Sequence, residues 1–117
     1  MKIILDTNFL IDLIRFKVDI RELRGNNLFV TDSIVFELNK IAKRKTSEAI
    51  RAKLALGMIE AKGLKTLKSI EKNTDQTLVA YSQINYAIAT QDSLLKTLIR
   101  KRGGKVIYIR QKKYVVM

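Results

Sequence analysis

The chain contains no cysteine and no histidine, and it also lacks proline. Without cysteine there can be no disulfide, no thiolate metal ligand and no cysteine nucleophile. Without histidine the chain has neither the most frequent general base nor the commonest ligand of transition metals. Any catalysis must therefore use carboxylates, hydroxyls, amides, lysine or a bound hard cation.

Acidic residues are also scarce, because 11 Asp and Glu stand against 23 Lys and Arg, which gives a net charge of +12. A small domain with this balance favours a polyanionic partner, and nucleic acid is the first candidate. The alternative is a lysine-rich surface that only keeps the protein in solution. An anionic membrane surface fits less well, because no segment combines a large apolar face with a basic one.

No long hydrophobic run is present. The N-terminal apolar stretch is interrupted by Asp6 and Asp12, too early for a signal peptide or a membrane span. We therefore expect a cytoplasmic protein with no membrane partner. The length of 117 residues and the apolar fraction of 47% predict one globular domain over residues 1–117. Residues 110–117 form either a basic tail or an edge strand.

Apolar patterning predicts strands and helices that alternate along the chain. Strands are expected at 2–5, 28–30, 64–67, 86–90 and 106–109, and helices at about 7–14, 33–43, 47–62, 75–83 and 93–102. This alternation predicts an α/β fold with a mainly parallel sheet and right-handed crossovers. The helix at 47–62 is expected to bury Ala49, Ile50, Leu54 and Met58.

Four acids fall where such a fold gathers strand ends and helix starts. Asp6 and Asp92 follow strands, Glu37 lies one turn into a helix, and Asp75 opens a helix. The carboxyl ends of parallel strands form a crevice, so these side chains can converge. Clustered carboxylates repel one another unless a hard cation such as Mg²⁺ or Mn²⁺ is bound. One or two such ions can activate water and stabilise the leaving oxygen of a phosphodiester.

Three of the four acids also have a simpler interpretation. Asp6 and Asp92 can cap the helices that follow them, and Asp75 can complement a helix dipole. Glu37 lies too far into its helix to cap it, and on a helical wheel it flanks the apolar face. Because burying an unpaired acid is costly, we expect a functional role for Glu37. Thr31 and Asp32 are both N-cap candidates for the same helix, and Asp32 is the one we expect.

Three polar residues are candidates for supporting roles. Asn8 can bind a metal-bound water or orient a carboxylate, and Thr90 can do the same. Ser33 can donate to Glu37 or to a phosphate. Local turn hydrogen bonding is the alternative for these side chains.

The ordered segments Leu5-Asp6-Thr7-Asn8, Thr31 to Leu38 and Ile88 to Asp92 resemble the PIN-domain ribonucleases. The basic segment 102–114 resembles small archaeal PIN proteins related to the nucleases of the ribosomal small-subunit processome. The resemblance implies a three-layer α/β/α sandwich with about five strands. It also implies Mg²⁺ or Mn²⁺ held by Asp6, Glu37, Asp75 and Asp92, and cleavage of single-stranded RNA. Thr74 departs from the family pattern, because relatives often have a second acid there.

The sequence thus predicts a metal-dependent endoribonuclease, with ribosomal RNA processing as one setting. The alternatives are a non-catalytic RNA-binding assembly factor, or the toxin nuclease of a toxin–antitoxin pair with a protein partner. Phe36 lies opposite the apolar face of its helix, where it can mark a homodimer contact. Basic residues near the expected cleft are candidates for phosphate contacts: Lys40, Lys43, Arg44, Lys45, Lys68, Lys72, Lys96, Arg100, Arg110, Lys112 and Lys113.

Overall fold

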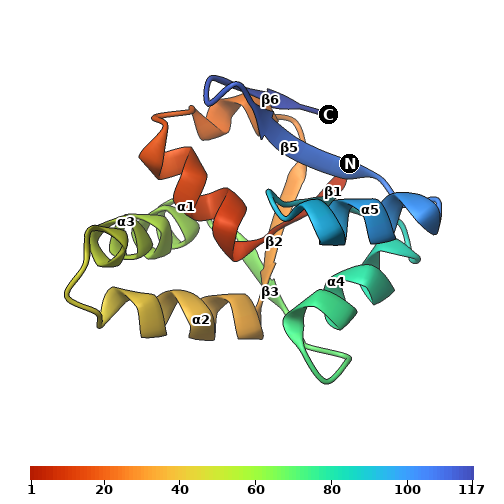
Figure 1. Ribbon diagram of the computed structural model, residues 1–117, viewed down its shortest axis with the longest axis horizontal. Helices are drawn as coiled ribbons and strands as arrows, with labels where there is room; N and C mark the ends of the chain where they lie inside the picture. The colour runs from red at the N-terminus through yellow and green to blue at the C-terminus, as the bar shows by residue number, and fades with distance from the viewer.

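The computed structural model describes residues 1–117, which form one sheet of six strands between two layers of helices (Figure 1). The strand order is β3-β2-β1-β4-β5-β6. The first five strands are parallel, and β6 pairs antiparallel with β5 at the sheet edge. The strands are β1 (Lys2–Leu5), β2 (Asn27–Thr31), β3 (Lys65–Leu67), β4 (Tyr86–Ala89), β5 (Val106–Arg110) and β6 (Tyr114–Val116).

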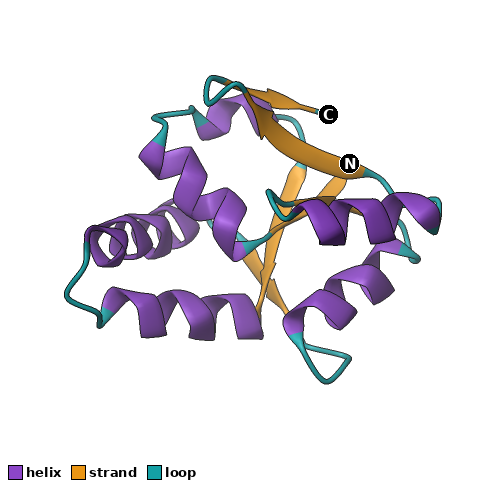
Figure 2. Cartoon of the chain, in the orientation of Figure 1, coloured by secondary structure: helices purple, strands orange, loops and turns teal.

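The helices cover both faces of the sheet, with α1, α2 and α3 on one side and α4 and α5 on the other (Figures 1 and 2). Their bounds are α1 (Thr7–Arg15), α2 (Asp32–Ala42), α3 (Ser47–Ala61), α4 (Thr74–Ser82) and α5 (Ser93–Lys101), with a 3₁₀ turn at Ile20–Leu23. The expected α/β sandwich with a mainly parallel sheet is confirmed. No helix combines the length and the apolar character that a membrane crossing requires.

The chain adds its strands first on one side of β1 and then on the other, so the strand order reverses between β1 and β4. From β1 it moves outward through β2 to β3, and it then returns through α4 to place β4 on the other side of β1. Because crossovers are right-handed, the helices before and after this return lie on opposite faces. The carboxyl ends of β1 and β4 therefore border an open crevice, where ligands of such sheets bind.

The buried face of α3 differs from the prediction. Ile50 and Leu54 are 63% and 54% exposed, whereas Ala52, Ala55 and Ile59 are buried. Apolar residues occur on every side of this helix, so their spacing does not define one face. The alanines are small enough to let α3 pack against both α1 and α2, and this packing selects the alanine face.

The start of α2 also differs from the prediction. Thr31, not Asp32, caps the helix, with its Oγ1 accepting the backbone N–H of Ile34 at 3.2 Å. The Asp32 carboxylate instead accepts the Ser69 backbone N–H at 3.0 Å and also the Ser69 hydroxyl. These hydrogen bonds hold the loop between β3 and α4 against the start of α2. They lower the pKa of Asp32, chiefly through the Ser69 hydroxyl.

Two glycine-to-alanine substitutions should have opposite effects on stability. A Cβ at Gly104 would lie 2.6 Å from Ile99 Cγ2 and 3.1 Å from Ser82 Cβ, so Gly104→Ala should destabilise by about 1–3 kcal/mol through overpacking. A Cβ at Gly57, inside α3, meets nothing within 4 Å. Gly57→Ala should therefore stabilise by about 0.5–1 kcal/mol. Urea unfolding of both variants measures the contrast, and equal shifts would contradict this packing.

Candidate active site

Asp6 and Thr90 meet where β1 and β4 end side by side. Asp6 is the N-cap of α1 and only 7% exposed, with its Oδ1 accepting the Thr7 backbone N–H at 2.8 Å. Its Oδ2 accepts a hydrogen bond from Thr90 Oγ1, also at 2.8 Å, and Thr90 is fully buried. Each carboxylate oxygen has more than one lone-pair site, so capping α1 and binding a cation are compatible roles.

Thr90 also connects Asp6 to Asp92. The Asp92 backbone N–H donates to Thr90 Oγ1 at 3.2 Å, and Asp92 Oδ1 caps α5 by accepting the Leu95 backbone N–H at 3.0 Å. Capping is therefore a real role of Asp92. The backbone of the half-buried Asp92 and the buried carboxylate of Asp6 nevertheless bond the same Thr90 hydroxyl, at the carboxyl ends of neighbouring strands.

Asn8 and Gln91 brace the same crevice. Asn8 Oδ1 accepts the Gln91 backbone N–H at 3.1 Å and lies 3.3 Å from Thr90 Oγ1. The Gln91 amide makes two bonds to Ile109 of β5, accepting its N–H at 2.7 Å and donating to its carbonyl at 3.3 Å. Gln91 was a candidate for supporting the acids, like Thr90, but its bonds to β5 were not predicted, because nothing in the local pattern reveals this partner.

Glu37 and Asp75 complete the acidic group from the two helical layers. The charges of Asp75 and Glu37 both act on Asp6, and the charge of Asp92 acts on Asp75. We expected Glu37 to be partly buried at the edge of the apolar face of its helix. This prediction is wrong, because α2 turns the Glu37 side chain towards solvent. It lies between two hollows of about 250 and 230 Å³, the second of which is also lined by Thr7 and Asn8.

Ser33 has no bond to Glu37. Its hydroxyl lies 2.9 Å from Thr31 Oγ1 and accepts a hydrogen bond from Thr74 Oγ1, also at 2.9 Å. Ser33 therefore joins the start of α2 to the start of α4, the helix that carries Asp75. This chain of hydroxyls sets how closely the Glu37 and Asp75 helices approach each other.

The acids at this crevice have no cationic partner. The one ion pair of the chain joins Arg21 to Asp19 at 2.7 Å, and neither residue belongs to this acidic group. Burial raises the pKa of Asp6 from 3.8 to about 6, against the opposing hydrogen bonds from Thr90 and Thr7. Partial burial of the Asp75 carboxyl, followed by the charge of Asp92, raises the pKa of Asp75 as well.

This donor set fits a hard divalent cation. All four acids offer oxygen ligands, and their uncompensated negative charge would be neutralised by such an ion. No three of them approach closely enough to hold one ion by themselves. Mg²⁺ commonly binds through one or two carboxylates and keeps several waters, so a partial protein shell remains compatible with it.

The predicted phosphate-binding residues separate into distinct groups. Lys40 and Lys72 line the 250 Å³ hollow beside Glu37. Lys96 and Arg100 lie over the half-buried Tyr108 ring, at 4.7 and 5.7 Å from its centre. The remaining candidates are exposed: Lys43, Arg44 and Lys45 after α2, Lys68 after β3, Arg110 at the end of β5, and Lys112 and Lys113 in the β5–β6 turn.

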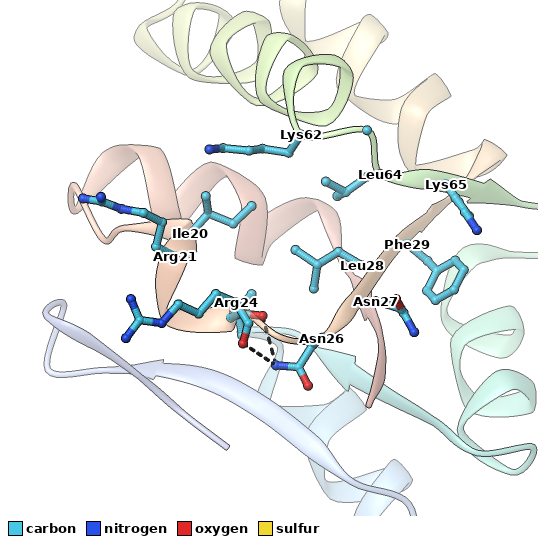
Figure 3. Close-up of a pocket in the computed structure, with 12 residues that line it drawn as sticks. Ile20, Arg21, Arg24, Asn26, Asn27, Leu28, Phe29, Lys62, Leu64 and Lys65 are labelled. Carbon is cyan, nitrogen blue, oxygen red and sulfur yellow. Dashed lines mark hydrogen bonds between the residues drawn. The ribbon is translucent and has the colours of Figure 1, made fainter.

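A separate hollow of about 330 Å³ lies at the opposite end of the sheet (Figure 3). Leu28 and Leu64 project into it from the amino-terminal ends of β2 and β3, and Lys62 extends across it from the end of α3. The carboxylates follow the carboxyl ends of parallel strands, so this hollow is no part of their site.

The comparisons with known proteins agree with this architecture. A family model described as a PIN-like domain matches residues 3–112, so the chain belongs to the PIN-like domain family. A domain of a functionally unknown protein from Methanocaldococcus jannaschii has the same fold, with a TM-score of 0.68 and 16% sequence identity over 93% of this chain and 91% of that one. Comparison with curated proteins gives no significant match. PIN domains are in general metal-dependent nucleases.

Proposed function

We propose that this protein is a metal-dependent endoribonuclease that cleaves single-stranded RNA. The observation that carries the proposal is the Asp6 carboxylate, which is buried, has no cationic partner and is acted on by the charges of Asp75 and Glu37. A protein of net charge +12 that only bound a polyanion would gain nothing from this acidic group.

The residues have separate tasks in this proposal. Asp6 and Asp92 offer carboxylate oxygens from the two strand ends, and Glu37 and Asp75 offer theirs from α2 and α4. A divalent ion, when bound, supplies charge neutralisation and lowers the pKa of water. Thr90 orients Asp6 through its 2.8 Å hydrogen bond, and Asn8 fixes the backbone that leads to Asp92.

The basic C-terminal segment supports a role on ribosomal RNA. Residues 102–114, which carry the resemblance to processome-related PIN proteins, run from the residue after α5 through strand β5 to the first residue of β6. Arg110, Lys112 and Lys113 are exposed around the β5–β6 turn, and no acid pairs with them. They are available for phosphates of a large structured RNA.

Cleavage assays with the purified protein test the proposed activity. Single-stranded and structured RNAs are incubated with Mg²⁺, Mn²⁺ or EDTA, using wild type, Asp6→Asn and the control Glu60→Gln, which changes an exposed acid of α3. We expect cleavage only with a divalent ion, its loss in Asp6→Asn and its retention in Glu60→Gln. Metal-independent binding with no cleavage by any of them would favour an assembly factor instead.

Binding to single-stranded RNA should depend strongly on salt. If about five phosphates are neutralised, log K should fall with log salt with a slope of about −3.5. Replacing Lys72, which lines the hollow beside Glu37, by methionine should flatten that slope by about 0.7, the share of one phosphate. Lys53→Met, an exposed change on α3, serves as the control and should leave the slope unchanged. Fluorescence anisotropy titrations at several salt concentrations measure both slopes.

A further inference from the structure

Phe36 is an aromatic side chain that the fold leaves uncovered. It is 67% exposed on α2, directly before Glu37, while Ile34 and Leu38 on the same helix are fully buried. Nothing in the core requires an aromatic ring at this position. An exposed aromatic ring beside a hollow lined by polar and basic side chains is a surface on which a nucleobase can stack.

The surroundings of the ring indicate what binds there. Phe36 is the only apolar residue lining the 250 Å³ hollow, whose other walls come from the start of α2, the loop before α4 and Glu37 itself. Lys40 Nζ lies 6.0 Å from the centre of the Phe36 ring, and Lys72 lines the same hollow. Ser33, Asn73 and Thr74 add polar side chains, and Glu71 is the one further acid.

We propose that Phe36 is a stacking platform for one nucleobase of the RNA, with Lys40 and Lys72 contacting the phosphates on either side of it. This inference rests on the proposed function and names where the substrate is held. Base stacking on an aromatic ring accepts any base, and lysines beside the ring match the charge of the backbone. Because Glu37 lines the same hollow, the stacked nucleotide lies next to the Glu37 carboxylate.

RNA fits this surface better than a second copy of the chain does. A symmetric contact through Phe36 would bring together two copies of a protein with a net charge of +12, each with Lys40 and Lys72 near the ring. Like charges facing each other across an interface oppose association. A nucleic acid strand instead neutralises the same lysines.

Equilibrium binding of a fluorescent single-stranded oligoribonucleotide tests the platform. Titrations in EDTA, which prevents metal-dependent cleavage, compare wild type with Phe36→Leu, Phe36→Tyr and the control Ile50→Ala, an equally exposed apolar position on α3. Stacking predicts that Phe36→Leu raises Kd at least about fivefold, the equivalent of about 1 kcal/mol. Phe36→Tyr keeps the ring and should bind within about twofold of wild type. Ile50→Ala should bind as wild type does.

The salt dependence and the oligomeric state complete the test. Stacking releases no counterions, so Phe36→Leu should shift Kd while leaving the salt slope unchanged. Wild-type affinity in Phe36→Leu, with wild type still binding RNA in a salt-dependent manner, would overturn the platform but leave the nuclease proposal standing. A wild-type dimer that dissociates in Phe36→Leu without loss of RNA affinity would also overturn it, in favour of a protein contact. No RNA binding or cleavage by wild type would overturn both proposals.

Discussion

Replacing Asp6 by asparagine should make the protein more stable while it removes the proposed activity. At pH 7 without divalent ions, we expect the free energy of unfolding to rise by about 1–3 kcal/mol. The reason is that Asp6 is buried as an unpaired charge, with a pKa raised to about 6 mainly by burial. Asparagine fills the same space without charge: its Oδ1 can accept the Thr7 N–H, and its Nδ2 can donate to Thr90 Oγ1, whose hydroxyl then donates to Asn8 Oδ1.

The pH dependence identifies the origin of this gain. A carboxyl whose folded pKa exceeds its unfolded value favours folding at low pH, and that contribution is lost as the pH rises. For Asp6 the loss runs from about pH 4 to about pH 6, so wild type and Asp6→Asn should be about equally stable below pH 4 and diverge above it. Denaturant unfolding from pH 3 to pH 8 in EDTA measures the difference.

Asp19 offers a control of opposite sign. Its pKa is lowered by its hydrogen bond to Arg21. Asp19→Asn should therefore be less stable than wild type at neutral pH, with the difference shrinking as the pH falls.

Adding Mg²⁺ or Mn²⁺ should stabilise wild type but not Asp6→Asn, because only a folded protein with an intact site binds the ion. An Asp6→Asn protein less stable than wild type at pH 7 in EDTA would contradict the placement of an unpaired charge at Asp6.

The second large effect is expected at Thr90. Thr90→Val removes the hydroxyl that donates to Asp6 Oδ2 and accepts the Asp92 backbone N–H, without changing the side chain's shape. Losing a hydrogen bond to a charged group costs about 1.5–3 kcal/mol, so we expect a destabilisation of about 2 kcal/mol at pH 7. The pKa of Asp6 should rise further, since the Thr90 hydrogen bond holds it down.

Thr90→Ser is the matched control, because it retains the hydroxyl and should restore most of the stability and cleavage. A double-mutant cycle with Asp6→Asn separates the two bonds of Thr90. Thr90→Val should cost less in the Asp6→Asn background, since the bond to a charge is then already absent. An equal cost in both backgrounds would mean that the Asp6–Thr90 bond contributes little.

Much of the fold could be predicted from the sequence, because its signals are local. Buried strands appear as short apolar runs, and breaks appear at residues such as Gly25 and Gly63, which adopt positive φ angles. Asp6 and Asp92 were predicted as site residues because they come shortly after such runs. Local signals were insufficient for α3, where apolar residues surround the helix and only packing against α1 and α2 selects the buried alanines.

By itself the sequence determined the chemistry open to this protein: oxygen donors without histidine or cysteine, an excess of positive charge, and acids placed after strands. Only the tertiary structure decided which groups meet. It joined Asp6 to Thr90, 84 residues away, and Gln91 to Ile109 on β5. It also turned Glu37 to solvent and left Phe36 uncovered beside it. The physical reason is that hydrogen bonding and burial between distant segments depend on how strands and helices pack, and residue order along one element does not specify that packing.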